Sequence, residues 1–244
     1  MEATLIGAGE VGRVFLRGAG AHTIRVVRRG DAIEPLPTGP IVVAVREEAL
    51  AAVVPALRSV APRCVFLQNG LVDDDLAPLG EVTRGIVWFT AKGSLFEELA
   101  PTAFHGGEAE AAASWLGGSG ATTRIEPNEA SFRLEIAKKL AWNNVAGLGP
   151  HVRGTTLGAY LADHRDEVRA IVDETLRVCA ARWGSPVATD ATIALLEATC
   201  RPIAHLRGGT SGLAWRNGAV ARLGRSLGID TPANDALLAQ VRRD

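Results

Sequence analysis

The chain has 244 residues, of which 47% are hydrophobic and 22% are charged, so it can bury a core and is not disordered. Its formal net charge of −1 argues against nucleic acid as a general partner, and no apolar run is long enough to span a bilayer. The three cysteines are odd in number and widely spaced, which predicts a reduced cytoplasmic protein with buried thiols and gives no reason to expect a metal.

The first half of the chain alternates strand-like and helix-like segments. Strands are predicted at residues 3–7, 23–28, 40–46, 64–70, 83–93 and 121–127, and helices at 10–20, 47–61 and 108–116. This alternation predicts a Rossmann-type, doubly wound parallel sheet of the α/β class. The first strand begins almost at the N-terminus, which leaves no room for a signal peptide.

The second half of the chain is predicted to be all helical. Helical spacing covers residues 131–149, 163–184, 190–205 and 211–229. In the second of these, one face carries Val168, Ile171, Val172, Leu176 and Cys179. We therefore expect two domains, an NADP-binding domain at 1–126 and a helical substrate domain at 127–244.

A glycine-rich turn follows the first predicted strand. Gly7 permits a tight turn, Gly9 lets the backbone approach a pyrophosphate, and Gly12 lets the helix pack on the strand. The helix N-terminus offers N–H groups to phosphates. A plain strand-to-helix turn is the alternative, but the context favours a dinucleotide site. The expected cofactor-binding run is Gly7, Ala8, Gly9, Glu10, Val11 and Gly12.

The end of the second predicted strand selects the cofactor. An NAD-selective site usually carries an acidic residue there, but this chain has Arg28 and Arg29. A guanidinium can pair with a 2′-phosphate through two N–H bonds, which predicts NADP(H). Two solvated arginines are the alternative, and Asp31 is a rival ligand for the ribose.

Lysine is rare in this chain and marks a candidate site. Lys92, Lys138 and Lys139 are the only lysines among 26 basic residues. Burial can tune a lysine to release its proton near neutral pH, whereas arginine cannot be tuned so. Lys139 and Asn143 stand four residues apart, so both project from one helical face and can donate to a substrate oxygen. The alternative, a surface charge on an amphipathic helix, is favoured for Lys138 only.

Three motifs together resemble the ketopantoate reductase (2-dehydropantoate 2-reductase) family over nearly the whole chain. They are FLQNG at 66–70, KKLAWNNVAGLGP at 138–150, and the C-terminal helix and turn at 217–234. The resemblance implies a 6-phosphogluconate-dehydrogenase-like enzyme of pantothenate biosynthesis. NADPH would bind the Rossmann domain and a small oxo acid would bind between the two domains. A homodimer through the helical domain is expected by analogy alone.

The resemblance also implies roles for individual residues. Lys139 takes the place of the catalytic lysine and general acid, and Asn143 that of the asparagine one helical turn later. Asn69 matches an asparagine near the nicotinamide and the substrate, although Asn-Gly by itself also favours a turn. Arg46 lies where the family often has a lysine, and Arg29, with Arg28 beside it, matches the arginine on the 2′-phosphate.

The chain departs from the family at the substrate. Gly212 occupies the position of a glutamate that helps to bind substrate and to hold the lysine; Glu174 and Glu197 are candidate replacements. The family's substrate-binding serine aligns near Thr199 or Cys200. Thr199, Thr210, Ser211 and Arg216 are candidate partners for a carboxylate, a solvated helix face being the simpler interpretation of Arg216. The substrate is therefore open: ketopantoate or a related 2-oxo acid, another carbonyl or imine, or none, in a non-catalytic NADP(H)-binding protein.

Overall fold

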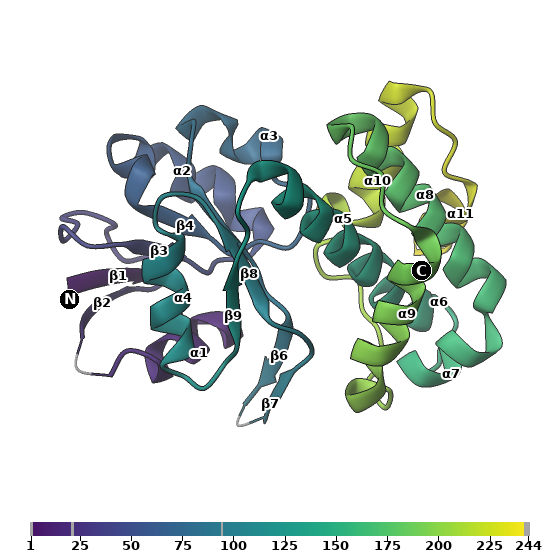
Figure 1. Cartoon of the computed structure of the whole chain (residues 1–244), viewed down its shortest axis with the longest axis horizontal. Helices are drawn as coiled ribbons and strands as arrows, with labels where there is room; N and C mark the ends of the chain where they lie inside the picture. Colours follow the sequence, from purple (N-terminus) through teal and green to yellow (C-terminus); the bar gives the residue numbers. More distant parts are fainter. Residues whose placement is uncertain (1, 21, 94, 242–244) are drawn as a thin grey trace. The chain divides into compact units, whose positions relative to one another are not determined.

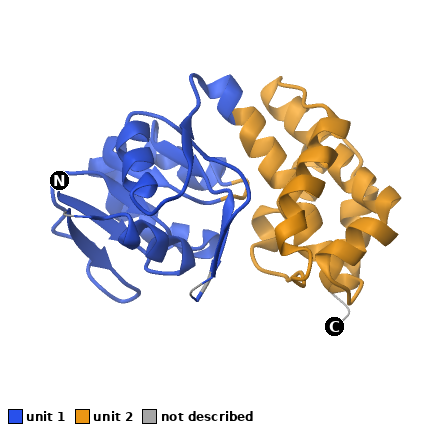
Figure 2. Cartoon of the chain, turned by 60° about the horizontal axis from the view of Figure 1, so that its bottom comes forward, with its two compact units in different colours: residues 1–68, 72–132 blue, residues 69–71, 133–244 orange. Residues whose placement is uncertain are grey.

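The chain forms two compact units in the computed structural model, which describes residues 2–20, 22–93 and 95–241 (Figure 2). Unit 1 runs to Gln68 and resumes over Val72–Phe132. Unit 2 consists of Asn69–Leu71 and the chain from Arg133 onward. Three residues from the middle of the first half thus belong to unit 2. The division into functional domains at residues 126 and 127 stays a prediction.

Unit 1 is built on a seven-stranded, mostly parallel sheet, which confirms the predicted α/β fold class (Figure 1). The strand order is β2-β1-β3-β4-β5-β8-β9, and among the described residues of this sheet only the β5–β8 pair is antiparallel. A separate antiparallel pair joins β6 and β7. The strands are β1 Glu2–Ile6, β2 Thr23–Val27, β3 Ile41–Val43, β4 Cys64–Phe66, β5 Thr83–Ile86, β6 Phe89–Lys92, β7 Leu95–Glu98, β8 Thr102–His105 and β9 Thr123–Ile125.

The central strands are apolar because both faces of the sheet are covered. Leu5, Val42 and Val65, from β1, β3 and β4, are fully buried. From β1 the chain moves to one neighbour, β2, and then back past β1 to β3 on the other side. Such a reversal of winding leaves a crevice at the carboxyl ends of the strands, where ligands of open α/β sheets bind.

Helices cover both faces of this sheet (Figure 1). They are α1 Glu10–Arg17, α2 Leu50–Leu57, α3 Asp73–Leu76 and α4 Ala109–Gly117, with short 3-10 helices at η1 Glu47–Ala49, η2 Arg58–Arg63 and η3 Ala77–Leu79. On one face α1 and α4 pack together through Phe15 and Trp115, whose rings meet edge to face at 5.5 Å between centroids. The Trp115 indole N–H also donates to the Phe15 carbonyl at 2.8 Å. These contacts fix the helix that follows the glycine turn.

The structure refines two details of the sequence prediction. The β-rich segment expected at 83–93 consists of two strands, β5 and β6, separated by the buried Trp88. The Trp88 carbonyl accepts from the backbone N–H groups of Leu99 and Ala100, which turns the chain away from the large sheet. The helix expected at 47–61 is a central α-helix flanked by η1 and η2. Pro55 and Pro62 lie within these segments, and each lacks the N–H that a regular helix requires.

Unit 2 is helical throughout the residues that the structure describes. Its helices are α5 Glu129–Ala146, which begins in unit 1, α6 Leu148–Val152, α7 Leu157–Asp163, α8 Arg165–Trp183, α9 Thr189–Cys200, α10 Asn217–Leu227 and α11 Pro232–Val241, with η4 Arg201–Ile203 and η5 Leu213–Trp215. The predicted apolar face of α8 is confirmed, because all five of its residues are buried. Among residues 2–20, 22–93 and 95–241, we find no helix with the length and apolarity to cross a bilayer.

Candidate functional site

The three glycines of the first turn differ in why the structure has glycine at each position. Gly7 has φ +96°, and a Cβ there would lie 2.8 Å from the Ala44 backbone. A Cβ on Gly12 would lie 2.0 Å from the Gly7 carbonyl oxygen. Gly9 precedes α1 with an ordinary φ of −70°, and a Cβ there would meet no atom within 4 Å. The fold therefore requires Gly7 and Gly12, whereas Gly9 leaves open space beside the helix N-terminus.

A cavity of about 820 Å³ opens beside this turn, within unit 1. Its lining comes from the segments that follow β1, β2 and β3, at the crevice expected from the strand order. The predicted cofactor residues that line it are Gly7, Ala8, Gly9, Arg28, Arg29 and Arg46. Glu10, Val11 and Gly12 belong to the first turns of α1, and Asn69 belongs to unit 2.

Basic side chains are concentrated at one part of this cavity. Arg28, Arg29 and Arg46 are exposed and line it together with Asp31. One carboxylate oxygen of Asp31 accepts from the Arg28 backbone N–H at 2.8 Å, which closes the turn after β2. Asp31, the alternative ligand for the ribose, is thus part of the local turn. The three guanidinium groups give the cavity a net positive lining. An anionic group such as a phosphate fits this lining.

Lys139 is a buried lysine on α5, in unit 2. Its side chain is only 3% exposed, and Nζ lies 3.9 Å from the centroid of the Trp142 ring. Burial first, and then the neighbouring Arg216 guanidinium, lower the pKa of Lys139 from 10.5 to about 7; Cys200 acts weakly in the opposite direction. An amine with this pKa exchanges its proton readily at neutral pH, as a general acid or base must.

The Asn143 side chain connects the motif at residues 138–150 with the motif at residues 66–70. It lies on α5 one turn after Lys139 and is 5% exposed. Its amide Nδ2 donates to the Asn69 carbonyl at 3.1 Å. Gly70 packs against Trp215, since a Cβ at Gly70 would lie 2.6 Å from the Trp215 Cβ. The Asn69–Gly70 turn is therefore held in unit 2 by side chains from α5 and η5.

Thr199 and Cys200, at the end of α9, complete the surroundings of Lys139. The Trp142 indole N–H donates to the Thr199 hydroxyl at 3.0 Å, and that hydroxyl donates to the Leu195 carbonyl at 2.8 Å. Thr199 thus orients the Trp142 ring beside Lys139. Burial raises the pKa of the Cys200 thiol to about 12, so it stays protonated at neutral pH. The contact between Trp142 and Lys139 was not predicted, because no chemical motif marks an aromatic residue that holds a lysine.

Arg216 folds back over Gly212. Gly212 has φ +68°, and a Cβ there would lie 3.1 Å from the Arg216 Nε and 3.2 Å from its Cζ. The guanidinium Nε is buried, and the group acts on Lys139. Interpreting Arg216 as a residue of a solvated face is therefore wrong. Gly212 supplies both the left-handed backbone and the space that the guanidinium fills.

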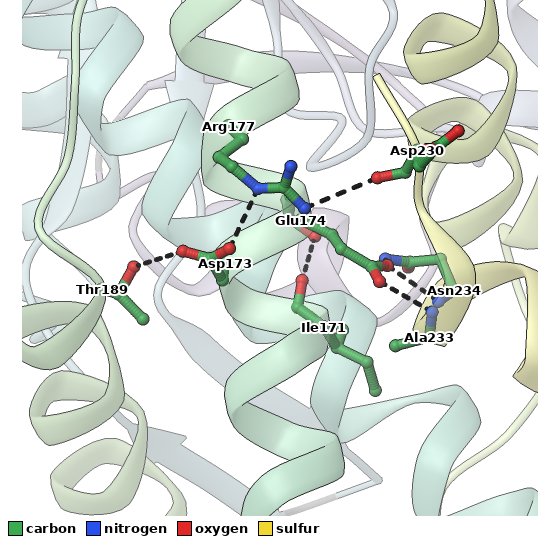
Figure 3. Close-up of polar contacts among 9 residues, drawn as sticks. Ile171, Asp173, Glu174, Arg177, Thr189, Asp230, Ala233 and Asn234 are labelled. Carbon is green, nitrogen blue, oxygen red and sulfur yellow. Dashed lines mark hydrogen bonds and ion pairs between the residues drawn. The ribbon is translucent and has the colours of Figure 1, made fainter. Parts of the chain in front are cut away.

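The carboxylates considered as replacements for the family glutamate lie elsewhere. Glu174, on α8, accepts from the backbone N–H groups of Ala233 and Asn234 at 2.7 and 3.0 Å, and from the Asn234 amide at 2.8 Å (Figure 3). It therefore caps the N-terminus of α11. Glu197 is exposed on α9. Glu174 is therefore engaged in this cap, and the role of Glu197 stays a prediction.

Three further candidates for substrate binding or catalysis are less buried than Lys139. Ser211 and Thr210 are exposed in the loop before η5. Lys138 donates to the buried Glu135 carboxylate at 2.7 Å, which ties it to its own helix. Of the residues considered for chemistry in unit 2, the structure brings together Lys139, Asn143, Asn69, Thr199 and Arg216.

Comparison with known proteins identifies the helical half. The family model described as "Ketopantoate reductase PanE/ApbA C terminal" matches residues 131–243. The helical half is therefore similar to the C-terminal part of ketopantoate reductases. No curated protein matched the chain. The ketopantoate reductase match contains Lys139, Asn143, Gly212 and Arg216.

Solved structures share the fold over the whole chain. D-mandelate dehydrogenase with NADH has 18% identity and a TM-score of 0.79, covering 100% of this chain and 98% of that chain. A PanE/ApbA family ketopantoate reductase from Ralstonia eutropha has 17% identity and a TM-score of 0.79, covering 99% and 97%. The dimeric ketopantoate reductase from Staphylococcus aureus has 18% identity and a TM-score of 0.72, covering 100% of both chains. At these identities the likeness shows the fold.

Proposed function

We propose that this chain is an NADPH-dependent reductase that converts a 2-oxo acid, ketopantoate or a related compound, to the 2-hydroxy acid. The observation that carries the proposal is the burial of Lys139 against Trp142, on a helix within the match to the ketopantoate reductase family; this burial lowers the pKa of the lysine to about 7. The similar D-mandelate dehydrogenase, whose structure contains NADH, supports a nicotinamide cofactor.

The cavity of unit 1 fits such a cofactor. Gly9 provides the open space that a pyrophosphate needs beside the helix N-terminus, and Gly7 shapes the turn. Arg28 and Arg29 line this cavity, where their guanidinium groups would pair with a 2′-phosphate, and Arg46 would add positive charge at the end of β3. We propose NADPH rather than NADH for this reason. When bound, the reduced nicotinamide supplies a hydride to the carbonyl carbon of the substrate.

Lys139 completes the reaction as general acid. As the carbonyl carbon accepts the hydride, its oxygen gains negative charge and takes a proton from the Lys139 ammonium, which leaves the neutral amine. The amine then recovers a proton from solvent. Because the pKa of Lys139 is about 7, its ammonium is a stronger acid than that of an ordinary lysine, and the exchange of its proton with solvent is nearly balanced at neutral pH. Trp142, fixed by Thr199, holds Nζ in place for this step.

Asn143 and Asn69 are proposed as positioning groups for the same step. The Asn143 amide carries two hydrogens, and one of them is used to hold the Asn69 carbonyl. The second is available in principle to the substrate oxygen, as the i, i+4 spacing from Lys139 predicts. Ser211 remains a proposed substrate contact, because it lies in the exposed loop beside Gly212.

The test is a Lys139→Ala variant with Lys138→Ala as the matched control. Purified proteins are titrated with NADPH by fluorescence and assayed with ketopantoate and a panel of other 2-oxo acids. We expect wild type and Lys138→Ala to reduce at least one 2-oxo acid. Lys139→Ala should bind NADPH normally and lose about 10²- to 10⁴-fold in kcat. Equal turnover by Lys139→Ala would overturn the role of the lysine.

A reductase of another carbonyl or an imine is the second candidate. Gly212 favours it, because the resemblance to the ketopantoate reductase family implies a glutamate at this position, and its absence suggests a different substrate. The same panel, extended to aldehydes and to mixtures of oxo acids with amines, distinguishes the two candidates. A wild-type protein that binds NADPH but reduces nothing would indicate a non-catalytic NADP(H)-binding protein instead.

A further inference from the structure

Two cationic side chains lie in one cluster of unit 2. Lys139 comes from α5, and Arg216 lies at the start of α10. Trp142 and the end of α9 form the rest of the cluster. The Arg216 guanidinium lies over Gly212 with its Nε buried, and it is near enough to Lys139 to act on the lysine charge. The cluster therefore carries two cationic groups.

We propose that Arg216 binds the carboxylate of the substrate, so that this site selects compounds with a carboxylate next to the carbonyl group. The inference rests on the proposed function and names its substrate class. Arg216 presents N–H groups in a fixed fork that matches a carboxylate, and Lys139 is then left to serve the adjacent oxo oxygen. In a 2-oxo acid, Arg216 would thus face the carboxylate, and Lys139 would face the oxygen that becomes negatively charged during reduction.

Gly212 is the reason why Arg216 can take this position. A side chain at residue 212 would have its Cβ within 3.4 Å of three guanidinium atoms, and the φ of +68° would strain any residue other than glycine. The turn itself is closed by the Trp215 N–H, which donates to the Gly212 carbonyl at 3.0 Å. The glycine at position 212 and the placement of Arg216 therefore depend on each other.

Carboxylate binding at Arg216 has a consequence for the proton on Lys139. The groups that act on Lys139 are Arg216, before α10, and Cys200, at the end of α9; Lys138 on the same helix is bound to Glu135. An anion on Arg216 offsets its repulsion of the Lys139 ammonium. Substrate binding therefore favours the protonated lysine, and the enzyme takes up a proton as it binds a 2-oxo acid.

Oxalate is a suitable probe, since it carries adjacent carboxylates and cannot be reduced in this reaction. Its binding to the protein saturated with NADPH is measured by calorimetry at pH 8, in two buffers with different enthalpies of ionisation. We expect wild type to bind oxalate with uptake of a fraction of a proton. In Arg216→Gln the affinity should fall by about 10- to 100-fold and the proton uptake should decrease. Arg216→Lys, which keeps the charge without the fork, should lie between the two.

Arg222→Gln is the matched control. Arg222 is exposed on α10 and donates to the Ala214 carbonyl at 2.6 Å, so its loss disturbs the same turn without touching the cation pair. Oxalate affinity should be unchanged in this variant. An equal loss in Arg222→Gln and Arg216→Gln would assign the effect to the turn and overturn the proposal. The proposal would also be overturned if Arg216→Gln bound oxalate with unchanged affinity, or if wild type did not bind oxalate.

Kinetics separate this inference from the proposed function. Arg216→Gln should raise KM for a 2-oxo acid about 10-fold or more while leaving KM for its uncharged methyl ester unchanged. If oxalate binds through Arg216 but no 2-oxo acid is reduced, the proposed function fails and the carboxylate site stands. If reduction proceeds with equal KM in both proteins, the carboxylate site fails and the reductase stands.

Discussion

Replacing Lys139 with methionine should stabilise the protein while removing its proton donor. The unfolded chain binds a proton at this residue below pH 10.5, but the folded chain does so only below about pH 7. Each pKa unit corresponds to about 1.4 kcal/mol, so burial of Lys139 lowers the free energy of unfolding by up to about 4 kcal/mol at pH 7. Methionine has a similar length and no charge, and it avoids this penalty.

The sign of the pH dependence makes this prediction specific. Because the unfolded state binds more protons between pH 7 and pH 10.5, wild-type stability should rise with pH in this range. The advantage of Lys139→Met should therefore shrink by about 1.4 kcal/mol for each pH unit above 7. Urea unfolding without cofactor at pH 7, 8 and 9, followed by circular dichroism, measures it.

The neighbouring lysine provides the control. Lys138 is paired with the buried Glu135 at 2.7 Å, so Lys138→Met should lose stability, where Lys139→Met gains it. A Lys139→Met variant that is less stable than wild type at pH 7, or whose gain does not change between pH 7 and 9, would refute the account of Lys139 as a lysine whose charge is disfavoured by burial.

Three further predictions concern catalysis and the cofactor. Wild-type kcat/KM should fall with rising pH through about 7, and tenfold per unit above it, as Lys139 loses its proton; a flat profile up to pH 9 contradicts this. Replacing both Arg28 and Arg29 with serine should weaken NADPH about 10- to 100-fold and leave NADH unchanged in fluorescence titrations; parallel losses would argue against a 2′-phosphate site. Gly9→Ala should weaken NADPH at unchanged Tm, whereas Gly12→Ala, whose Cβ meets a carbonyl at 2.0 Å, should lower Tm; the reverse pattern would contradict the roles of these glycines.

Local patterns predicted the parts of the site that depend on neighbours in sequence. The glycine turn and the arginines after β2 follow directly from short segments, because a turn and the strand before it are determined within a few residues. The i, i+4 placement of Lys139 and Asn143 follows from helical geometry alone. Their chemical roles stay predictions, since sequence spacing gives neither burial nor charge environment.

The features of the fold and the site that were not predicted depend on contacts between residues far apart in the sequence. Strand β8 is four residues long and pairs antiparallel with β5, some twenty residues earlier, so no periodicity marked it. Glu174 caps a helix that begins nearly sixty residues later, which no local pattern shows. A solvated helix face was the simpler interpretation of Arg216, and only its contact with Gly212 and its buried Nε show that the guanidinium is enclosed.

The most direct test of the central claim is NADPH oxidation in the presence of ketopantoate and a panel of other 2-oxo acids, with wild type and Lys139→Ala side by side. We predict that wild type oxidises NADPH with at least one 2-oxo acid and forms one equivalent of the 2-hydroxy acid. Lys139→Ala should bind NADPH but lose at least about 10²-fold in rate. A folded wild-type protein that binds NADPH and reduces no member of the panel would contradict the claim.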